Sequence, residues 1–183
     1  MLRSIVSSGF VLSVALLAPS ARADVSSWAN ASAGPSFIDE GTGMQTQGAL
    51  SLQAGLGSTP ENFLVGGGLF HVETHFTHGT DVALLGRIAT QGYVLGDWGG
   101  AFDLGPYGRF WGIGSEGVLG ALVLGAPWGI TLRGEAALGT NDARSFGILL
   151  GVDFLRLTIF RQPGTDWFPN PYPAYRPEKS AQK

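Results

Sequence analysis

The chain has 183 residues, enough for one domain, and combines 44% hydrophobic and only 14% charged residues with 29 glycines and a positive mean hydropathy of +0.17. Its formal net charge of −3 excludes the basic surface that nucleic-acid binding requires, so no nucleic-acid partner is expected. The sequence contains no cysteine, which excludes disulfide bonds and thiolate chemistry.

The first 23 residues are predicted to be a secretory signal peptide. They contain basic Arg3, an apolar stretch over 5–17 and a small-x-small cleavage signal, Ala-Arg-Ala, at 21–23. A retained N-terminal anchor is the alternative interpretation, which the apolar stretch disfavours because it is shorter than the ~20 residues of a membrane-spanning helix. Removal of this segment would lower the number of basic residues from 11 to nine, against 14 acids.

The following sequence alternates apolar and polar residues with a period of two. Leu50 and Leu52, for example, alternate with Ser51 and Gln53. This period is typical of a β-strand with two chemically different faces. The longest apolar stretch after the predicted signal peptide, 118–132, is interrupted by a proline and by glycines, so no transmembrane helix is expected there.

Seven turn signals separate the alternating segments and therefore predict eight strands. An all-β protein, an eight-stranded antiparallel up-and-down β-barrel, is the expected fold for residues 24–161. The strands are predicted over 25–38, 45–57, 62–77, 81–96, 101–113, 118–126, 129–139 and 144–161.

The charged residues indicate which strand face is interior. Lysine is confined to Lys179 and Lys183, whereas the polar strand faces carry acids and arginines in nearly equal number, which can pair inside a narrow barrel. This balance favours a polar interior and an apolar, lipid-facing exterior. Alternation alone leaves the reverse orientation open, which would give a soluble periplasmic barrel for a small apolar ligand. The predicted interior polar cluster is His71, Glu73, His75, Arg87, Asp103, Arg109, Arg133, Glu135 and Asp153.

Aromatic residues near the predicted turns are expected to lie at the membrane interfaces. These interfacial aromatics are Trp28, Trp98, Trp111, Trp128 and Trp167. Residues 162–183 contain five of the ten prolines and are predicted to form an extended tail that could bind a periplasmic partner.

In architecture the chain resembles the small eight-stranded outer-membrane barrels of Gram-negative bacteria, the class that includes the OmpA barrel and OmpX. The resemblance implies a place in the outer membrane, with the periplasm as the alternative, and contact with outer-membrane lipid and the barrel-assembly machinery. The chain departs from this class in its short predicted outer loops. It also departs at its last predicted strand, because such barrels commonly end on an aromatic residue, whereas the candidates here, Phe160 and Phe154, are followed by some twenty more residues. Arg156 has the same parity as Phe154 and Phe160, which predicts either a bulge near 155 or a strand end outside the hydrocarbon.

The sequence His71-Val-Glu73-Thr-His75 is the principal candidate for chemistry. On a strand the three polar side chains point the same way, with neighbours ~6.6 Å apart. His71 and His75 are therefore the candidate metal ligands. Some barrels of the resembled class are lipid A deacylases or acyltransferases, and the resemblance implies for them a His, a Ser and an acid on the lipid-facing side of the barrel wall. A hydrolase site is therefore a second interpretation, although no serine lies within two residues of either histidine. We favour a third interpretation, in which these residues pair with Arg87 inside the barrel.

Together these observations predict a structural or envelope-associated outer-membrane barrel that is too narrow for a general pore. We assign no catalytic residue and no cofactor from the sequence. The alternatives are a lipid-modifying or metal-binding barrel centred on His71, Glu73 and His75, and the soluble periplasmic barrel.

Overall fold

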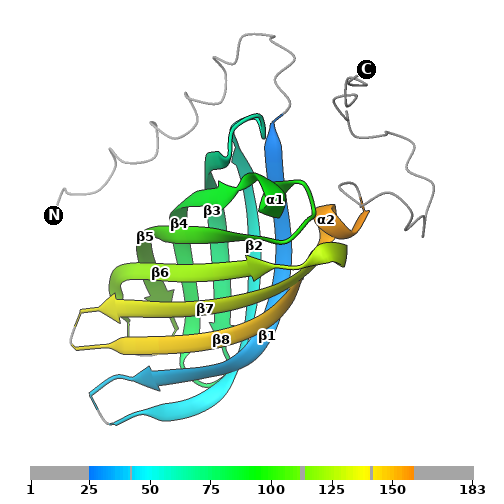
Figure 1. Cartoon of the computed structure of the whole chain (residues 1–183). Coiled ribbons are helices and arrows are strands. Elements are labelled where there is room, and N and C mark those ends of the chain that lie inside the picture. The colour runs from blue at the N-terminus through cyan, green and yellow to red at the C-terminus, as the bar shows by residue number, and fades with distance from the viewer. Residues whose placement is uncertain (1–24, 42, 112–113, 141, 159–183) are drawn as a thin grey trace, which may run out of the picture.

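The computed structural model describes residues 25–41, 43–111, 114–140 and 142–158, and these form the closed barrel shown in Figure 1. The predicted signal peptide at 1–23 and the predicted tail at 162–183 lie outside the described residues. The described strands are β1 (Ser26–Asp39), β2 (Gln45–Gly57), β3 (Leu64–His75), β4 (Gly79–Thr90), β5 (Gly99–Phe110), β6 (Glu116–Gly125), β7 (Ile130–Gly139) and β8 (Arg144–Asp153). The predicted eight-stranded antiparallel barrel is confirmed.

Three short helices lie in connections or after the last strand. They are α1 (Gln91–Val94), η1 (Pro127–Gly129) and α2 (Phe154–Thr158). Figure 1 shows α1 and α2 at the same end of the barrel as the start of β1. Within the described residues no helix is both long enough and apolar enough to cross a membrane.

The barrel closes because the first strand pairs with the last. β1 and β8 are antiparallel neighbours, with Asn30 opposite Asp153 and Asp39 opposite Arg144. Each strand therefore has a hydrogen-bonded neighbour on both sides, and the sheet has no free edge along which another chain could add.

The polar face of the strands is the interior face. On β2, Ser51 is 0% exposed and Gln53 6%, whereas Leu50 is 46% and Leu52 55% exposed. The same alternation continues around the barrel, with charged residues buried and large apolar residues exposed. The alternative of a soluble barrel required the apolar face of the strands to be interior. The structure has the opposite orientation, with the polar face inside.

Apolar side chains nevertheless fill part of the interior. Leu69, Leu85 and Leu119 pack in one buried group with Tyr107. A second group at the α1 end contains Trp28, Val65, Tyr93, Val94, Val123 and two alanines. Together with the polar residues, these two groups fill the interior with side chains, as expected for a barrel of eight strands.

The fourth strand is shorter than predicted. The alternating pattern predicted a strand over 81–96, but β4 ends at Thr90 and α1 follows it. The Thr90 hydroxyl accepts hydrogen bonds from the backbone N–H of Tyr93 at 3.3 Å and of Gly100 at 3.1 Å. Thr90 thus caps the helical turn and holds it against the first residues of β5. Its hydroxyl favours a helical turn over continuation of the strand, and the period-two pattern does not reveal this.

The last strand also ends early, at Asp153 instead of within the predicted 144–161. Asp153 Oδ1 accepts hydrogen bonds from the backbone N–H of Leu155 at 3.0 Å and of Arg156 at 3.1 Å, which begins the helical turn α2. The turn takes Arg156 off the strand parity and buries its side chain. A helix, and not the predicted bulge or projecting strand end, therefore explains the parity of Arg156.

Candidate functional site in the barrel interior

The structure places all nine residues of the predicted polar cluster inside the barrel. Each is buried, and together they come from β3, β4, β5, β7 and β8. The shared parity of residues within each strand places them on the inner face, and barrel closure turns these faces toward a common interior.

One ion-pair network connects β4, β5 and β7 through Asp103. The Arg87 guanidinium donates to both oxygens of Asp103, at 2.6 and 2.8 Å. Arg133 donates to the same carboxylate at 2.7 Å and to Glu135 at 2.7 Å. Asp103 therefore compensates two buried guanidinium groups, which satisfies the requirement that interior charges be paired.

A second network lies around Arg109. Its guanidinium donates to both oxygens of Asp81, at 2.6 and 2.8 Å, and to Glu40 at 3.0 Å. His75 Nε2 lies 3.2 Å from Asp81. Sequence reasoning missed Asp81 and Glu40, because Asp81 was assigned to the first residue of a strand and Glu40 to a turn. The inward parity that Asp81 shares with Arg87 was the signal that could have identified it.

The predicted pairing of the His71-to-His75 segment with Arg87 is wrong. In the β3–β4 register Arg87 lies opposite Gly67, and Asp81 lies opposite Glu73. Arg87 instead binds Asp103 and donates to Gln53 Oε1 at 3.2 Å. The residues of the segment are therefore left to other partners.

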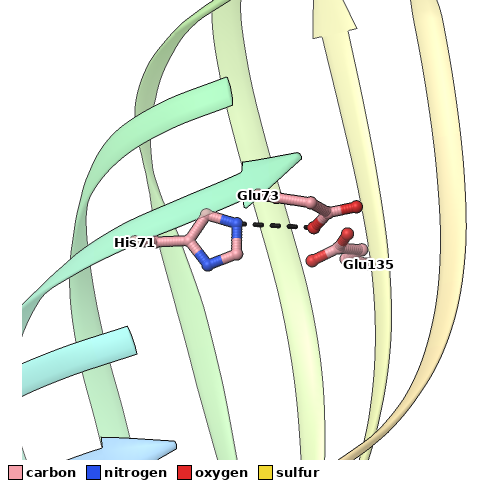
Figure 2. A group of neighbouring side chains, drawn as sticks. All are labelled: His71, Glu73 and Glu135. Carbon is pink, nitrogen blue, oxygen red and sulfur yellow. Dashed lines mark ion pairs between the residues drawn. The ribbon is translucent and has the colours of Figure 1, made fainter. Parts of the chain in front are cut away.

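Glu135, from the far wall of the barrel, approaches His71 and Glu73 (Figure 2). The three residues each offer one ligand atom, and these atoms lie within 4.8 Å of one another. His71 Nε2 is 3.5 Å from Glu73 Oε2. We call this group of His71, Glu73 and Glu135 the interior cluster. It differs from the predicted metal pair, because His75 points its Nε2 toward Asp81 and its place is taken by Glu135.

Several polar atoms of the interior cluster have no hydrogen-bond partner among the described residues. They are His71 Nε2 and both carboxylate oxygens of Glu73, to which no N–H or hydroxyl group donates. The Glu73 carboxyl group instead contacts the carboxyl group of Glu135. His75 Nδ1 is also without such a partner and lies 3.6 Å from Glu73 Oε1. The other ring nitrogen of His71, Nδ1, lies 3.2 Å from Gln53 Nε2 and 3.5 Å from Ser51 Oγ.

The contact between Ser51 and His71 bears on the hydrolase interpretation. β2 brings Ser51 to the histidine although it is 20 residues away in the sequence. Ser51, His71 and Glu73 are all buried on the inner face, at 0–1% exposure. This arrangement differs from the lipid-facing hydrolase site implied by the resemblance, since none of the three side chains reaches the outer wall.

The prediction that Trp28 is an interfacial residue is wrong, because its side chain lies inside the barrel and is only 2% exposed. It shares the inward parity of Asn30 and Ser32 on β1. The Arg87 guanidinium carbon lies 5.2 Å from the Trp28 ring centroid and 5.5 Å from that of Tyr93. Trp28 therefore contributes cation–π contacts to the interior.

The remaining predicted interfacial tryptophans lie at the two ends of the barrel or outside the described residues. Trp98 and Trp128 are exposed in the β4–β5 and β6–β7 connections, at the α1 end. Trp111 is exposed just after β5, at the opposite end. Trp167 lies outside the described residues.

The α1 end is closed by an arginine that stacks on an aromatic ring. Arg156 of α2 lies with its guanidinium carbon 4.7 Å from the Tyr93 ring centroid, and donates to the Asp97 carbonyl at 2.6 Å. Burial raises the pKa of the Tyr93 hydroxyl and lowers the pKa of Arg156. The two helical turns thus meet over the interior through Tyr93 and Arg156.

A comparison with protein-family models found no match, and comparisons with curated proteins and with solved structures found none either.

Proposed function

We propose that the chain is an integral outer-membrane β-barrel with a structural or envelope-associated role and no catalytic activity. The observation that carries this proposal is the apolar exterior of a closed barrel whose charges lie inside. Water is a poor solvent for such an exterior, whereas the hydrocarbon of a bilayer is a suitable one.

Large apolar side chains are exposed on every strand from β2 to β8. Examples, one from each of these strands in order, are Leu52, Phe70, Leu84, Leu104, Leu122, Leu132 and Leu150. A monomeric soluble protein rarely exposes a contiguous apolar patch larger than a few hundred Å². Seven neighbouring strands that all expose such residues favour contact with lipid over contact with water.

The hydrogen bonding of the backbone in the closed sheet supports the same proposal. In hydrocarbon an unpaired N–H or carbonyl group costs several kcal/mol, so only helices and closed barrels span a bilayer. The pairing of β1 with β8 meets this requirement. The exposed Trp98 and Trp128 at one end and Trp111 at the other agree with two interfacial aromatic positions.

The ion pairs and the apolar groups favour a structural role over a general pore. Arg133 on β7 reaches Asp103 on β5, and Asp103 reaches Arg87 on β4, so side chains bridge the interior. The buried leucines and Tyr93 fill further space. A barrel filled in this way holds its shape and leaves little room for a solute.

The test is the behaviour of the full chain in membranes and in detergent. Membranes of a Gram-negative host that express the chain should retain it through a sodium carbonate wash. The purified protein should migrate faster in a detergent gel before boiling than after it, because a folded membrane barrel stays compact. Release by carbonate, or identical migration with and without boiling, would contradict the proposal.

A further inference from the structure

The interior cluster joins two opposite walls of the barrel. His71 and Glu73 lie on β3 and Glu135 lies on β7, and these strands are separated by three others in either direction around the barrel. Their ligand atoms nevertheless lie within 4.8 Å of one another. Figure 2 shows the three side chains pointing toward one another. Side chains that converge in this way from opposite walls share either a proton, through the contact between the Glu73 and Glu135 carboxyl groups, or a common ligand.

The charges around Glu73 indicate that such a ligand is a cation. Among the described residues, Arg87 binds Asp103, Arg109 binds Asp81 and Glu40, and Arg133 binds Asp103 and Glu135. None of these guanidinium groups donates to Glu73. Within the described residues the Glu73 carboxyl group instead contacts the carboxyl group of Glu135 and lies 3.5 Å from His71 Nε2 and 3.6 Å from His75 Nδ1. Two buried carboxyl groups in contact cannot both be ionised without a compensating charge, so a cation between them would be strongly stabilising.

The distances suit a metal ion. Zinc binds histidine nitrogen and carboxylate oxygen at about 2.0–2.2 Å, which places two ligand atoms of a tetrahedral site roughly 3.4 Å apart. His71 Nε2 and Glu73 Oε2 are 3.5 Å apart. Among the described residues no group meets the criteria for a hydrogen bond with His71 Nε2, which faces the Glu73 carboxylate.

The second ring nitrogen of His71 has two polar neighbours. A histidine that binds a metal through one ring nitrogen usually donates the N–H of the other to a polar group. His71 Nδ1 lies 3.2 Å from Gln53 Nε2 and 3.5 Å from Ser51 Oγ, so metal binding through Nε2 requires Nδ1–H to donate to Ser51 and the Gln53 amide to turn away. An imidazole ligand favours zinc and similar transition metals over magnesium and calcium, which prefer oxygen alone.

We propose that the interior cluster of His71, Glu73 and Glu135 binds a divalent transition-metal ion of the zinc class. The ion compensates the Glu73 carboxylate and cross-links β3 to β7 through the interior. With three protein ligands the ion keeps one open coordination position, and burial of the ligands inside the barrel limits access to it. This inference does not depend on the location of the barrel, since it concerns the interior alone.

The first experiment measures zinc in the folded full chain. The protein is made without a histidine tag, refolded in detergent with zinc chloride, desalted and analysed by mass spectrometry for metal content. The wild type should retain about one zinc ion per chain. Glu73→Gln and Glu135→Gln should each bind zinc at least tenfold more weakly, because each removes a charged ligand.

Matched controls are available elsewhere in the chain. His78 lies in the β3–β4 turn and Glu116 is exposed at the start of β6, so His78→Ala and Glu116→Gln remove the same residue types outside the cluster. Both should retain zinc as the wild type does. Loss of zinc in His78→Ala, or full retention in both cluster variants, would place the ion elsewhere and overturn the proposal.

A measurement on the wild type alone covers the case in which a variant does not fold. The X-ray absorption spectrum of the zinc-loaded protein should show imidazole and carboxylate ligands at about 2.0–2.2 Å. A shell of oxygen alone would indicate adventitious zinc and overturn the proposal. A folded wild-type protein that retains no zinc would do so as well, and would leave a proton shared between Glu73 and Glu135 as the compensating charge.

Discussion

At the scale of single residues, the barrel interior depends on a few carboxylates that serve more than one partner. Asp103 accepts three hydrogen bonds from Arg87 and Arg133, whose guanidinium groups are both buried. Each arginine has one further partner, Gln53 for Arg87 and Glu135 for Arg133. Removal of the Asp103 charge would therefore leave two cations insufficiently compensated.

We expect Asp103→Asn to lower the free energy of unfolding by about 3–5 kcal/mol, the usual cost of removing one partner of a buried ion pair. The measurement is equilibrium urea unfolding of the refolded protein. Asp142→Asn is the matched control. Asp142 is exposed in the β7–β8 turn at φ 59°, a conformation that asparagine tolerates, so this change should cost less than about 0.5 kcal/mol. Equal stability of both variants would show that Asp103 does not hold the network together.

At the scale of the elements, the short hairpins are what bring distant inward residues into register. The β3–β4 turn ends at Gly79, which has φ +103° and lies close to the end of β5. A Cβ at this position would collide with the carbonyl oxygens of Trp111 and Phe110. Gly79 therefore serves both the turn and the approach of β4 to β5, the strands that present Asp81 and Arg109.

Gly79→Ala should be destabilising for two reasons, backbone strain of about 1–2 kcal/mol at positive φ and displacement of the end of β5, which adds roughly 1–3 kcal/mol. Gly43→Ala separates the two effects, because Gly43 has φ +104° and no atom of the described residues lies within 4 Å of an added Cβ. Thermal unfolding of both variants measures the difference. If Gly43→Ala were as destabilising as Gly79→Ala, the close approach to β5 would have no energetic role.

At the scale of the whole molecule, the proposed membrane location can be tested by whether the exterior of the barrel contacts lipid or water. Leu122 is 65% exposed near the middle of β6, with Gly134 opposite on β7. In water a charge at such an exposed position costs little, whereas in the centre of a bilayer it is expensive.

Leu122→Arg should therefore destabilise the barrel by about 2–4 kcal/mol when unfolding is measured in lipid vesicles. Leu122→Phe, which keeps the position apolar, should remain within about 0.5 kcal/mol of the wild type. The difference in stability between the two variants is informative, because a barrel whose exterior faces water would tolerate the arginine as readily as the phenylalanine. Equal stability of the two variants would argue against the membrane location.

The local pattern of the sequence was sufficient for the strands and for which residues share a face, and the near balance of acids and arginines on one face indicated that this face is interior. Period two and the turn signals predicted eight strands, and the parity of residues such as Arg133 and Asp153 predicted the side on which they are buried. Both properties are local, because neighbouring side chains of a strand point to opposite faces whatever the rest of the chain does.

Where local groups compete with the strand, the pattern was insufficient. The hydroxyl of Thr90 and the carboxylate of Asp153 accept backbone hydrogen bonds and end β4 and β8 in helical turns. Trp28 was predicted at the interface from its nearness to the strand end, but its parity directs it inward.

Only the tertiary structure decided which interior residues meet. The register between β3 and β4 takes Arg87 away from Glu73, and closure of the barrel brings Glu135 of β7 across to His71 and Glu73 of β3. These partners are set by strand stagger and by the width of a closed eight-stranded barrel, which are properties of all the strands together. The sequence by itself determined that His71 and Glu73 point inward, and the closed barrel determined that a carboxylate from the opposite wall lies beside them.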